Sequence, residues 1–362
     1  MSSDKMFLVT VSPHIHHKDS TSRIMLDVII ALIPAGIWGI YIFGVDSLTV
    51  ISVSIISAVL AEYAVGRLSG NNTLGDYSAL LTGILVGYNM PPGVDLYVPV
   101  IASVFAVIVV KWTFGGLGAN IVNPALAGRL FVTFSWTGAM TRWSAPSTNT
   151  AIDGIAGASP LGAVKTELMD LTGAINGPVE VLKDYPVSSM GSSISSWFST
   201  AAGTEINPVY FDLLIGNISG CIGEVSALLL AAGAVYLLAR KVITWEIPGA
   251  YLLSFALMVW IFDGLRFGTG YFSGDVFFHL FTGGLMLGAF YMATDMVTSP
   301  LTAKGQIIFG IGCGLLTYLI RAYGSFPEGV SLAILFMNIF VTMLDRITGP
   351  KLFGYIPREK RK

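Results

Sequence analysis

The sequence predicts an all-α integral membrane protein of about ten transmembrane helices. Two features of the composition lead to this prediction: 54% of the 362 residues are hydrophobic, and only 12% are charged. The mean hydropathy of +0.72 is also unusual for a soluble domain. A third feature is the recurrence of apolar runs long enough to cross a hydrocarbon core of about 30 Å. A single cleaved signal peptide would not produce such recurrence.

Apolar stretches bounded by charges, proline or glycine clusters define the ten candidate helices. They fall near 24–43, 48–66, 74–89, 96–113, 121–137, 224–240, 246–262, 275–293, 305–321 and 329–345. The third and fifth are short and interrupted by small residues. The predicted organisation is an N-terminal segment 1–22, a first five-helix repeat 23–140, a loop 141–222, a second five-helix repeat 223–346 and a basic tail 347–362.

The positive charges indicate how the chain is oriented. With the N-terminus in the cytoplasm, most lysines and arginines fall on the cytoplasmic side, including those of the tail REKRK. This asymmetry is expected for a multi-pass protein of the inner (cytoplasmic) membrane with both termini in the cytoplasm. The loop 141–222 is then extracytoplasmic. The net charge of −2 gives no indication of a nucleic-acid partner, and the basic tail suits an anionic lipid surface.

An internal repeat relates the two halves. The segment GDYSALLTGIL from Gly75 resembles GDVFFHLFTGGL from Gly274, with one inserted residue. The two copies lie on the third and eighth predicted helices. Because five helices per half is an odd number, the halves must face opposite ways, which predicts an inverted 5+5 repeat. The alternative is that LxTGxL is a common packing face of membrane helices.

A loop of small residues, TAIDGIAGASPLGAVK, occupies positions 150–165. Gly154 and Gly157 allow the backbone to approach a bulky ligand closely. The plain alternative is a linker between the two halves.

The stretch DGIAGAS within this loop resembles the flavin-attachment pattern Asp-x-x-Ser/Thr-Gly-Ala-Thr. Four further blocks resemble the D subunits of Rnf complexes (ion-translocating ferredoxin:NAD oxidoreductases) and the related B subunits of sodium-translocating NADH:quinone reductases. These blocks are SPHIHHKDSTSRIM, ANIVNPALAGRLF, GNISGCIGEVSAL and YMATDMVTSP. The five blocks occur in the same order along nearly the whole chain. The short N-terminal segment makes the Rnf D subunits the closer match.

The resemblance implies a flavin mononucleotide (FMN) joined by a phosphoester to Ser159, with Asp153, Gly157 and Ala158 completing the motif. Ser159 stands where threonine is usual, and Ala156 where serine or threonine is usual. A serine hydroxyl can form the same phosphoester. The resemblance also implies a non-covalent riboflavin within the bundle and partner subunits of an Rnf-type complex. In such a complex, electrons pass from ferredoxin to NAD while Na⁺ or H⁺ crosses the membrane, and this subunit relays electrons without being catalytic alone.

Charged residues within or near the predicted helices are candidates for function, because each costs about 2.5 to 3.5 kcal/mol on insertion scales. Arg129, six residues into the fifth helix, either holds an anionic cofactor or pairs with Asp76 or Glu62. Five further residues are candidates for an ion or proton path: Glu62, Asp76, His279, Asp295 and Asp345. Glu62 and Asp345 lie near helix ends, where we expect water to reach them.

Metal chemistry finds little support in the sequence. The two cysteines, Cys221 and Cys313, lie far apart, so this chain alone is expected to build neither an iron–sulfur cluster nor a zinc site. The cluster of His14, His16 and His17 has no nearby cysteine or acidic ligand, and a cytoplasmic contact surface is expected there.

Two other functions remain open at this stage. A secondary transporter or channel for a small solute would also suit an inverted repeat with broken helices. A flavin-free scaffold for partner subunits is the third possibility. The coupling ion cannot be read from single acidic residues, which serve Na⁺ and H⁺ alike.

Overall fold

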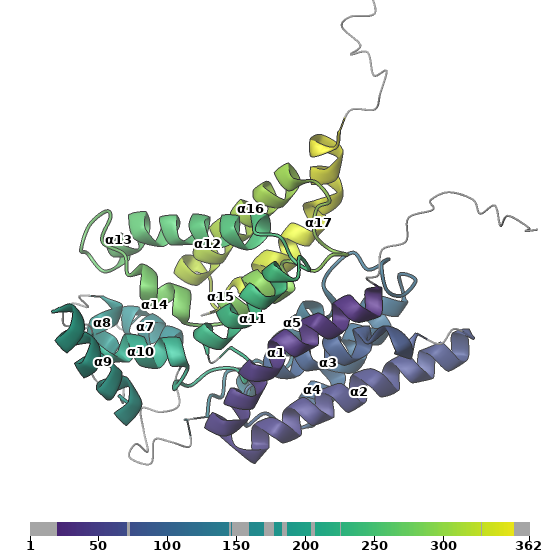
Figure 1. Cartoon of the computed structure of the whole chain (residues 1–362), viewed down its shortest axis with the longest axis horizontal. Helices are drawn as coiled ribbons and strands as arrows, with labels where there is room; N and C mark the ends of the chain where they lie inside the picture. The colour runs from purple at the N-terminus through teal and green to yellow at the C-terminus, as the bar shows by residue number, and fades with distance from the viewer. Residues whose placement is uncertain are drawn as a thin grey trace, which may run out of the picture.

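The computed structural model describes residues 20–70, 73–144, 146, 159–169, 177–182, 187–203, 207–224, 226–326 and 328–350. This described part contains helices and no strands. Two helical groups and a smaller cluster of helices between them in sequence make up the molecule (Figure 1).

The first half begins with two long helices joined at Gly44, whose φ of 78° allows the sharp turn between them. Ser20 caps the first helix by accepting a hydrogen bond from the Arg23 backbone N–H at 3.3 Å. The elements in chain order are α1 (Thr21–Phe43), α2 (Val45–Ser69), the short turn η1 (Leu74–Asp76), α3 (Ser78–Tyr88), α4 (Tyr97–Val104), its π-helical continuation η2 (Phe105–Trp112), α5 (Pro124–Ser135) and α6 (Thr137–Met140).

The second half follows the same plan but breaks its third segment into short pieces. Its elements are α11 (Ala227–Ala239), α12 (Glu246–Met258), η4 (Val259–Asp263), α13 (Gly264–Arg266), α14 (Val276–Phe281), α15 (Leu285–Leu287), η5 (Gly288–Met292), α16 (Ala303–Tyr323) and α17 (Val330–Thr348). Thr282 to Gly284 separate α14 from α15, and Gly283 has a φ of 66° that favours glycine.

Equivalent helices make equivalent contacts in the two halves. Helix α2 packs on α4 as α12 packs on α16, and α4 contacts α5 as α16 contacts α17. The two first helices, α1 and α11, contact each other, as do the two last helices, α5 and α17. Tyr88 donates a hydrogen bond to the Leu32 carbonyl at 2.9 Å, and Tyr291 donates one to the Leu230 carbonyl at the same distance. These pairs are what an inverted repeat predicts.

Four helices from the central loop lie together at one end of the bundle (Figure 1). They are α7 (Pro160–Met169), α8 (Pro178–Val181), α9 (Ser189–Ala202) and α10 (Pro208–Ile215). We call this side of the molecule the loop end. A separate apolar core, which includes Leu161, Leu213 and Phe278, joins these helices to the second half.

The outward faces of the long helices are apolar. Ile37 on α1 is 63% exposed and Ile339 on α17 is 58% exposed, although both are large aliphatic residues. Exposed aliphatic faces of this extent are suited to lipid rather than water. The predicted all-α membrane fold is therefore confirmed.

The count of ten transmembrane helices stays a prediction. Among the described residues, five helices have the length and composition to cross a membrane: Thr21–Phe43, Val45–Ser69, Glu246–Arg266, Ala303–Tyr323 and Val330–Thr348. Shorter apolar helices occur at Ser78–Tyr88, Tyr97–Trp112 and Ala227–Ala239. The division of the chain at 23–140, 141–222 and 223–346 also stays a prediction.

Candidate functional site

Ser159 lies immediately before α7 at the loop end. Its side-chain oxygen accepts a hydrogen bond from the Gly162 backbone N–H at 3.2 Å, and its carbonyl accepts one from Ala163 at 2.8 Å. Ser159 therefore occupies the position of a helix N-cap. The other predicted motif residues, Asp153, Gly157 and Ala158, lie outside the described residues.

A small cavity lies beside Ser159 and connects it to the bundle. About 10 Å³ of space is lined by Ser159 and Leu161 from the loop, by Glu224 before α11, by Gly283 at the helix break and by Glu328 before α17. Ser159 is only 6% exposed. The predicted attachment residue thus faces two carboxylates that belong to the membrane bundle.

Arg129 on α5 is the cation that these two carboxylates share. Its Nη1 atom lies 3.0 Å from Glu224 Oε1, and its Nη2 atom donates to Glu328 Oε2. Nη1 also reaches Asn89 Oδ1 at 2.7 Å and Ser331 Oγ at 2.9 Å. Asn89 follows α3 in the first half, whereas Glu224, Glu328 and Ser331 belong to the second half. Arg129 therefore joins both halves of the molecule in one buried polar cluster.

The predicted pairing of Arg129 with Asp76 or Glu62 is wrong. Asp76 accepts hydrogen bonds from Ser78 at the start of α3 instead. Glu62 binds Lys111 at 2.9 Å. Arg129 sits at the other end of the bundle from this pair, so sequence distance within the first half was misleading about which acids it meets. Its role as a cofactor-binding residue stays a prediction.

Glycines at the break between α14 and α15 make room for the acidic pair. A Cβ atom on Gly284 would lie 2.3 Å from Glu224 Oε1, which is closer than side-chain contacts allow. A Cβ atom on Gly283 would lie 3.0 Å from Arg321 Nη2. The helix break thus brings backbone, rather than side chains, against Glu224.

Lys165 fixes α7 to the rest of the loop end. Its Nζ atom donates to the Phe326 carbonyl at 2.9 Å and also to the Gly324 carbonyl. Partial burial lowers the pKa of Lys165, and the positive charge of Arg266 lowers it further. The loop that carries Glu328 is therefore attached directly to the helix that Ser159 caps.

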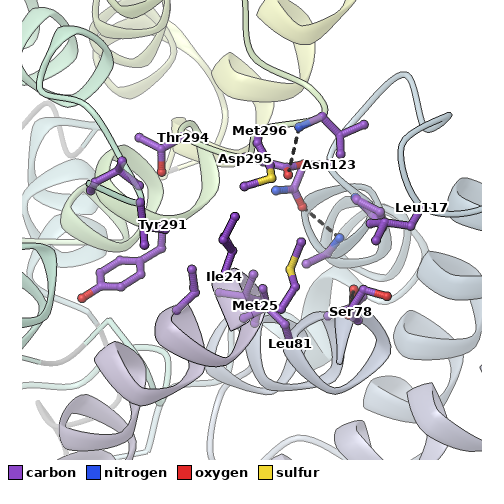
Figure 2. Close-up of a pocket in the computed structure, with 18 of the residues that line it drawn as sticks. Ile24, Met25, Ser78, Leu81, Leu117, Asn123, Tyr291, Thr294, Asp295 and Met296 are labelled. Carbon is purple, nitrogen blue, oxygen red and sulfur yellow. Dashed lines mark hydrogen bonds between the residues drawn. The ribbon is translucent and has the colours of Figure 1, made fainter. Parts of the chain in front are cut away.

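A second cavity lies between the two halves, on the side away from the loop end. It encloses about 80 Å³ and is partly open to the surroundings. Figure 2 shows Asn123 and Asp295 on one wall and Ile24, Met25 and Leu81 on the wall opposite. Most of the lining is apolar, and a few amide, hydroxyl and charged groups interrupt it. This is the usual character of a small-molecule site.

A buried acid lies near the end of the second helix in each half. Glu62 at the end of α2 pairs with Lys111 on η2, whereas Asp263 on η4 lies 3.0 Å from His279 Nε2 on α14. Asp263 also binds Arg266 at 3.0 Å. Glu62 is only 1% exposed, so the expectation that water reaches it at a helix end is wrong. The fold covers this end with η1 and η2, which a one-dimensional hydropathy pattern cannot show.

Sequence reasoning missed Glu224 and Glu328, the two residues that hold Arg129. Both precede a helix by a few residues and looked like ordinary charges at helix starts. The available signal was the isolated Arg129 itself, because a buried arginine requires acidic partners. Which acids serve could be learned only from the folded chain.

Comparison with known proteins places these features in a family. The sequence model of the NQR2, RnfD, RnfE family matches residues 8–354. The chain is 40% identical over 350 residues to the D subunit of a proton-translocating ferredoxin:NAD(+) oxidoreductase complex from Clostridium ljungdahlii, covering 96% of each protein.

Two further relatives carry related names. The D subunit of the Na(+)-translocating ferredoxin:NAD(+) oxidoreductase complex from Acetobacterium woodii is 40% identical over 349 residues, which are 96% of this chain and 95% of that protein. The D subunit of an ion-translocating oxidoreductase complex from Stutzerimonas stutzeri is 34% identical over 367 residues, covering 95% of each. Equal identity to a proton-translocating and a sodium-translocating relative means that overall similarity does not determine the coupling ion.

Proposed function

Because the chain belongs to the NQR2, RnfD, RnfE family, we propose that it is the flavin-carrying subunit that relays electrons within an Rnf-type complex. The chain is a multi-pass membrane protein and a subunit of an ion-translocating ferredoxin:NAD⁺ oxidoreductase complex, with the other subunits of that complex as its partners. The finer proposal concerns how this subunit handles electrons. Family membership also removes the reason to retain a solute transporter or channel as the alternative.

The position of Ser159 is the single observation that carries the flavin proposal. The phosphate of an FMN ester on Ser159 would lie at the N-terminus of α7, where backbone N–H groups and the helix dipole favour an anion. Pro160 occupies the first helical position, and Leu161 and Gly162 supply the next two N–H groups. The start of α7 therefore suits a phosphate. When bound, the flavin supplies reversible electron transfer that no side chain of this chain can supply.

The cavity between the halves supports a second, non-covalent flavin. An apolar site with a few polar groups suits the isoalloxazine ring of riboflavin, whose edge carries hydrogen-bonding atoms. Asn120 and Asn123 line this cavity beside the apolar wall of α1 and α3. We assign the Asn120 amide to the polar edge of the ring and the aliphatic side chains, including Leu81, to its faces; the Asn123 amide already caps α5 and binds the Met292 carbonyl.

The proposed orientation puts Ser159 outside the cytoplasm. The start of α1 and the end of α17 lie away from the loop end (Figure 1). With the basic tail on the cytoplasmic side of the inner membrane, the loop end lies on the other side of that membrane. The two flavins would then lie toward opposite faces of the membrane.

Fluorescence of the denatured chain tests covalent attachment. The protein is expressed with its partner subunits in a host that attaches flavin, and the denatured chain is viewed in a gel under ultraviolet light. We expect fluorescence from the wild type and none from Ser159→Ala. Ser188→Ala is the matched control, because Ser188 also caps a loop helix by accepting from the Gly191 N–H at 2.9 Å. A dark wild-type band would refute the covalent flavin.

Release of free flavin on denaturation tests the second site. We expect one riboflavin from each wild-type chain and none from Leu81→Trp, because the larger ring fills the cavity. The fluorescent band on the gel should survive this substitution. Ile37→Trp is the control, since Ile37 is 63% exposed on the outer face of α1. Equal riboflavin from both variants would place the second flavin elsewhere.

A further inference from the structure

Glu224 and Glu328 form a carboxylate pair beneath Ser159. One oxygen of each carboxylate and the Sγ atom of Cys221 lie within 4.8 Å of one another. The side chains of Glu224 and Glu328 are only 3% and 13% exposed. Like charges this close, and this far from water, favour protonation of one member of the pair.

Neighbouring cations offset the negative charge of the carboxylate pair. Arg129 on α5 donates to both carboxylates. The other cation that faces them is Arg321 on α16, which donates to the carbonyls of His279 and Thr282 at 2.7 and 3.0 Å. With two carboxylates and two guanidinium groups, one added or removed proton changes the net charge of the cluster.

Glu224 has the atom on which a proton can reside. Its Oε1 atom accepts from Arg129, but its Oε2 atom is buried and has no hydrogen-bond partner among the described residues. Such an atom normally costs about 1–3 kcal/mol when it is left unsatisfied. Glu224 also lines the cavity that Ser159 faces. If Oε2 of Glu224 carries a proton, its O–H group is a hydrogen-bond donor at the wall of this cavity.

A metal ion is a poor alternative occupant of this place. Arg129 already donates to each of the three residues that would bind it: Nη1 to Glu224, and Nη2 to Glu328 and to Cys221 Sγ at 3.6 Å. A cation would have to displace this guanidinium group. A proton can be added to a carboxylate oxygen without moving it.

We propose that Glu224 and Glu328 together bind one exchangeable proton, and that this proton balances the charge of an electron on the flavin carried by Ser159. The second half of this inference rests on the proposed flavin attachment. One electron arriving from the ferredoxin side adds one negative charge at the loop end. One proton from the adjoining aqueous phase converts a carboxylate to a carboxyl group, so a single O–H bond forms. When the electron leaves, that bond breaks and the proton returns.

Infrared spectroscopy of the flavin-free Ser159→Ala protein tests the proton site alone. A pH titration in detergent should give one buried carboxyl C=O band that appears as the pH falls and shifts in D₂O. Glu224→Gln or Glu328→Gln should remove this band. Glu167→Gln, which changes an exposed carboxylate on α7, should leave it in place. A band that persists in both glutamine variants would overturn the proton site. Should either variant fail to fold, the aspartate variant at that position shifts the band instead.

Redox titration of the flavinylated complex tests the coupling. The midpoint potential of the covalent flavin should depend on pH in the wild type and in Glu167→Gln. In Glu224→Gln and Glu328→Gln this dependence should be weaker, because only the protonation of the flavin ring itself remains, while the flavin fluorescence of the denatured chain stays unchanged. An unaltered pH dependence in both variants would overturn the coupling. A wild-type chain without covalent flavin would also overturn it, and the infrared titration would still decide the proton site.

Discussion

Breaking the buried pair of Glu62 and Lys111 should destabilise the protein strongly. Lys111 Nζ lies 2.9 Å from Glu62 Oε1 and 2.7 Å from Ser78 Oγ, and the Lys111 side chain is 2% exposed. In Lys111→Met the donors left to the Glu62 carboxylate among the residues that the structure describes are neutral: Trp112 Nε1, at 3.0 Å, and Thr73 Oγ1. Removing one partner of a buried pair costs about 3–5 kcal/mol, because the remaining charge is uncompensated.

The double variant Glu62→Gln/Lys111→Met removes both charges and isolates this penalty. Its remaining cost is the lost hydrogen bonds, about 0.5–1.5 kcal/mol each. We therefore expect the double variant to be more stable than Lys111→Met alone. The free energy of unfolding in mixed detergent micelles is measured for the wild type, Glu62→Gln, Lys111→Met and the double variant. These four values give the coupling energy directly. A coupling below about 0.5 kcal/mol would refute the reasoning.

Three further predictions concern single positions. Gly284→Ala should destabilise the protein by about 1–3 kcal/mol, because its Cβ would overlap the Glu224 carboxylate; thermal unfolding measures this, and an unchanged midpoint contradicts it. Tyr88→Phe and Tyr291→Phe should cost similar amounts, about 0.5–1.5 kcal/mol, because each removes one buried 2.9 Å hydrogen bond; clearly unequal losses in the same assay would argue against equivalent roles. Burial raises the pKa of Asp212, so its contribution to stability is present below the usual aspartate pKa and is lost as the pH rises through the folded value; hydrogen exchange of α9 should show this loss, and Asp212→Asn should remove it.

The long helices could be predicted from sequence because each carries its own local signals. Helix α16 begins at Ala303, after Thr302 accepts a hydrogen bond from the Gly305 N–H at 3.1 Å, and α17 ends before Gly349. The predicted ranges 305–321 and 329–345 correspond to these two helices. Hydropathy and caps act along the chain, so they are visible without the fold.

The repeat was also visible, because its residues perform the same local tasks twice. Asp275 caps α14 by accepting from the Phe278 N–H three residues later, and Asp76 accepts from the Ser78 N–H two residues later, just before α3. Thr82 and Thr282 each donate to the carbonyl four residues earlier, at 2.8 and 2.6 Å. The following glycines then diverge: Gly83 lies against α2, whereas Gly283 breaks the helix. Similar residues in the two segments therefore predicted similar local hydrogen bonds but not the same backbone path.

The partners of the buried charges were beyond the sequence. Arg129 and Glu328 are 199 positions apart and meet only because α5 and α17 pack together. A single sequence gives the cost of each buried charge but not the geometry that satisfies it. Ser159 could be proposed as an attachment site from its motif, whereas its place beside the acidic pair follows from tertiary packing alone.

The two hydrogen bonds of Lys165 have a mechanical consequence. They link α7 to the backbone just ahead of Glu328, so a displacement of α7 would be transmitted to that segment. A neighbouring protein that binds α7 would therefore also displace Glu328, one of the two acids of the pair. Subunit assembly at α7 and the charge of the buried carboxylate pair would then be coupled.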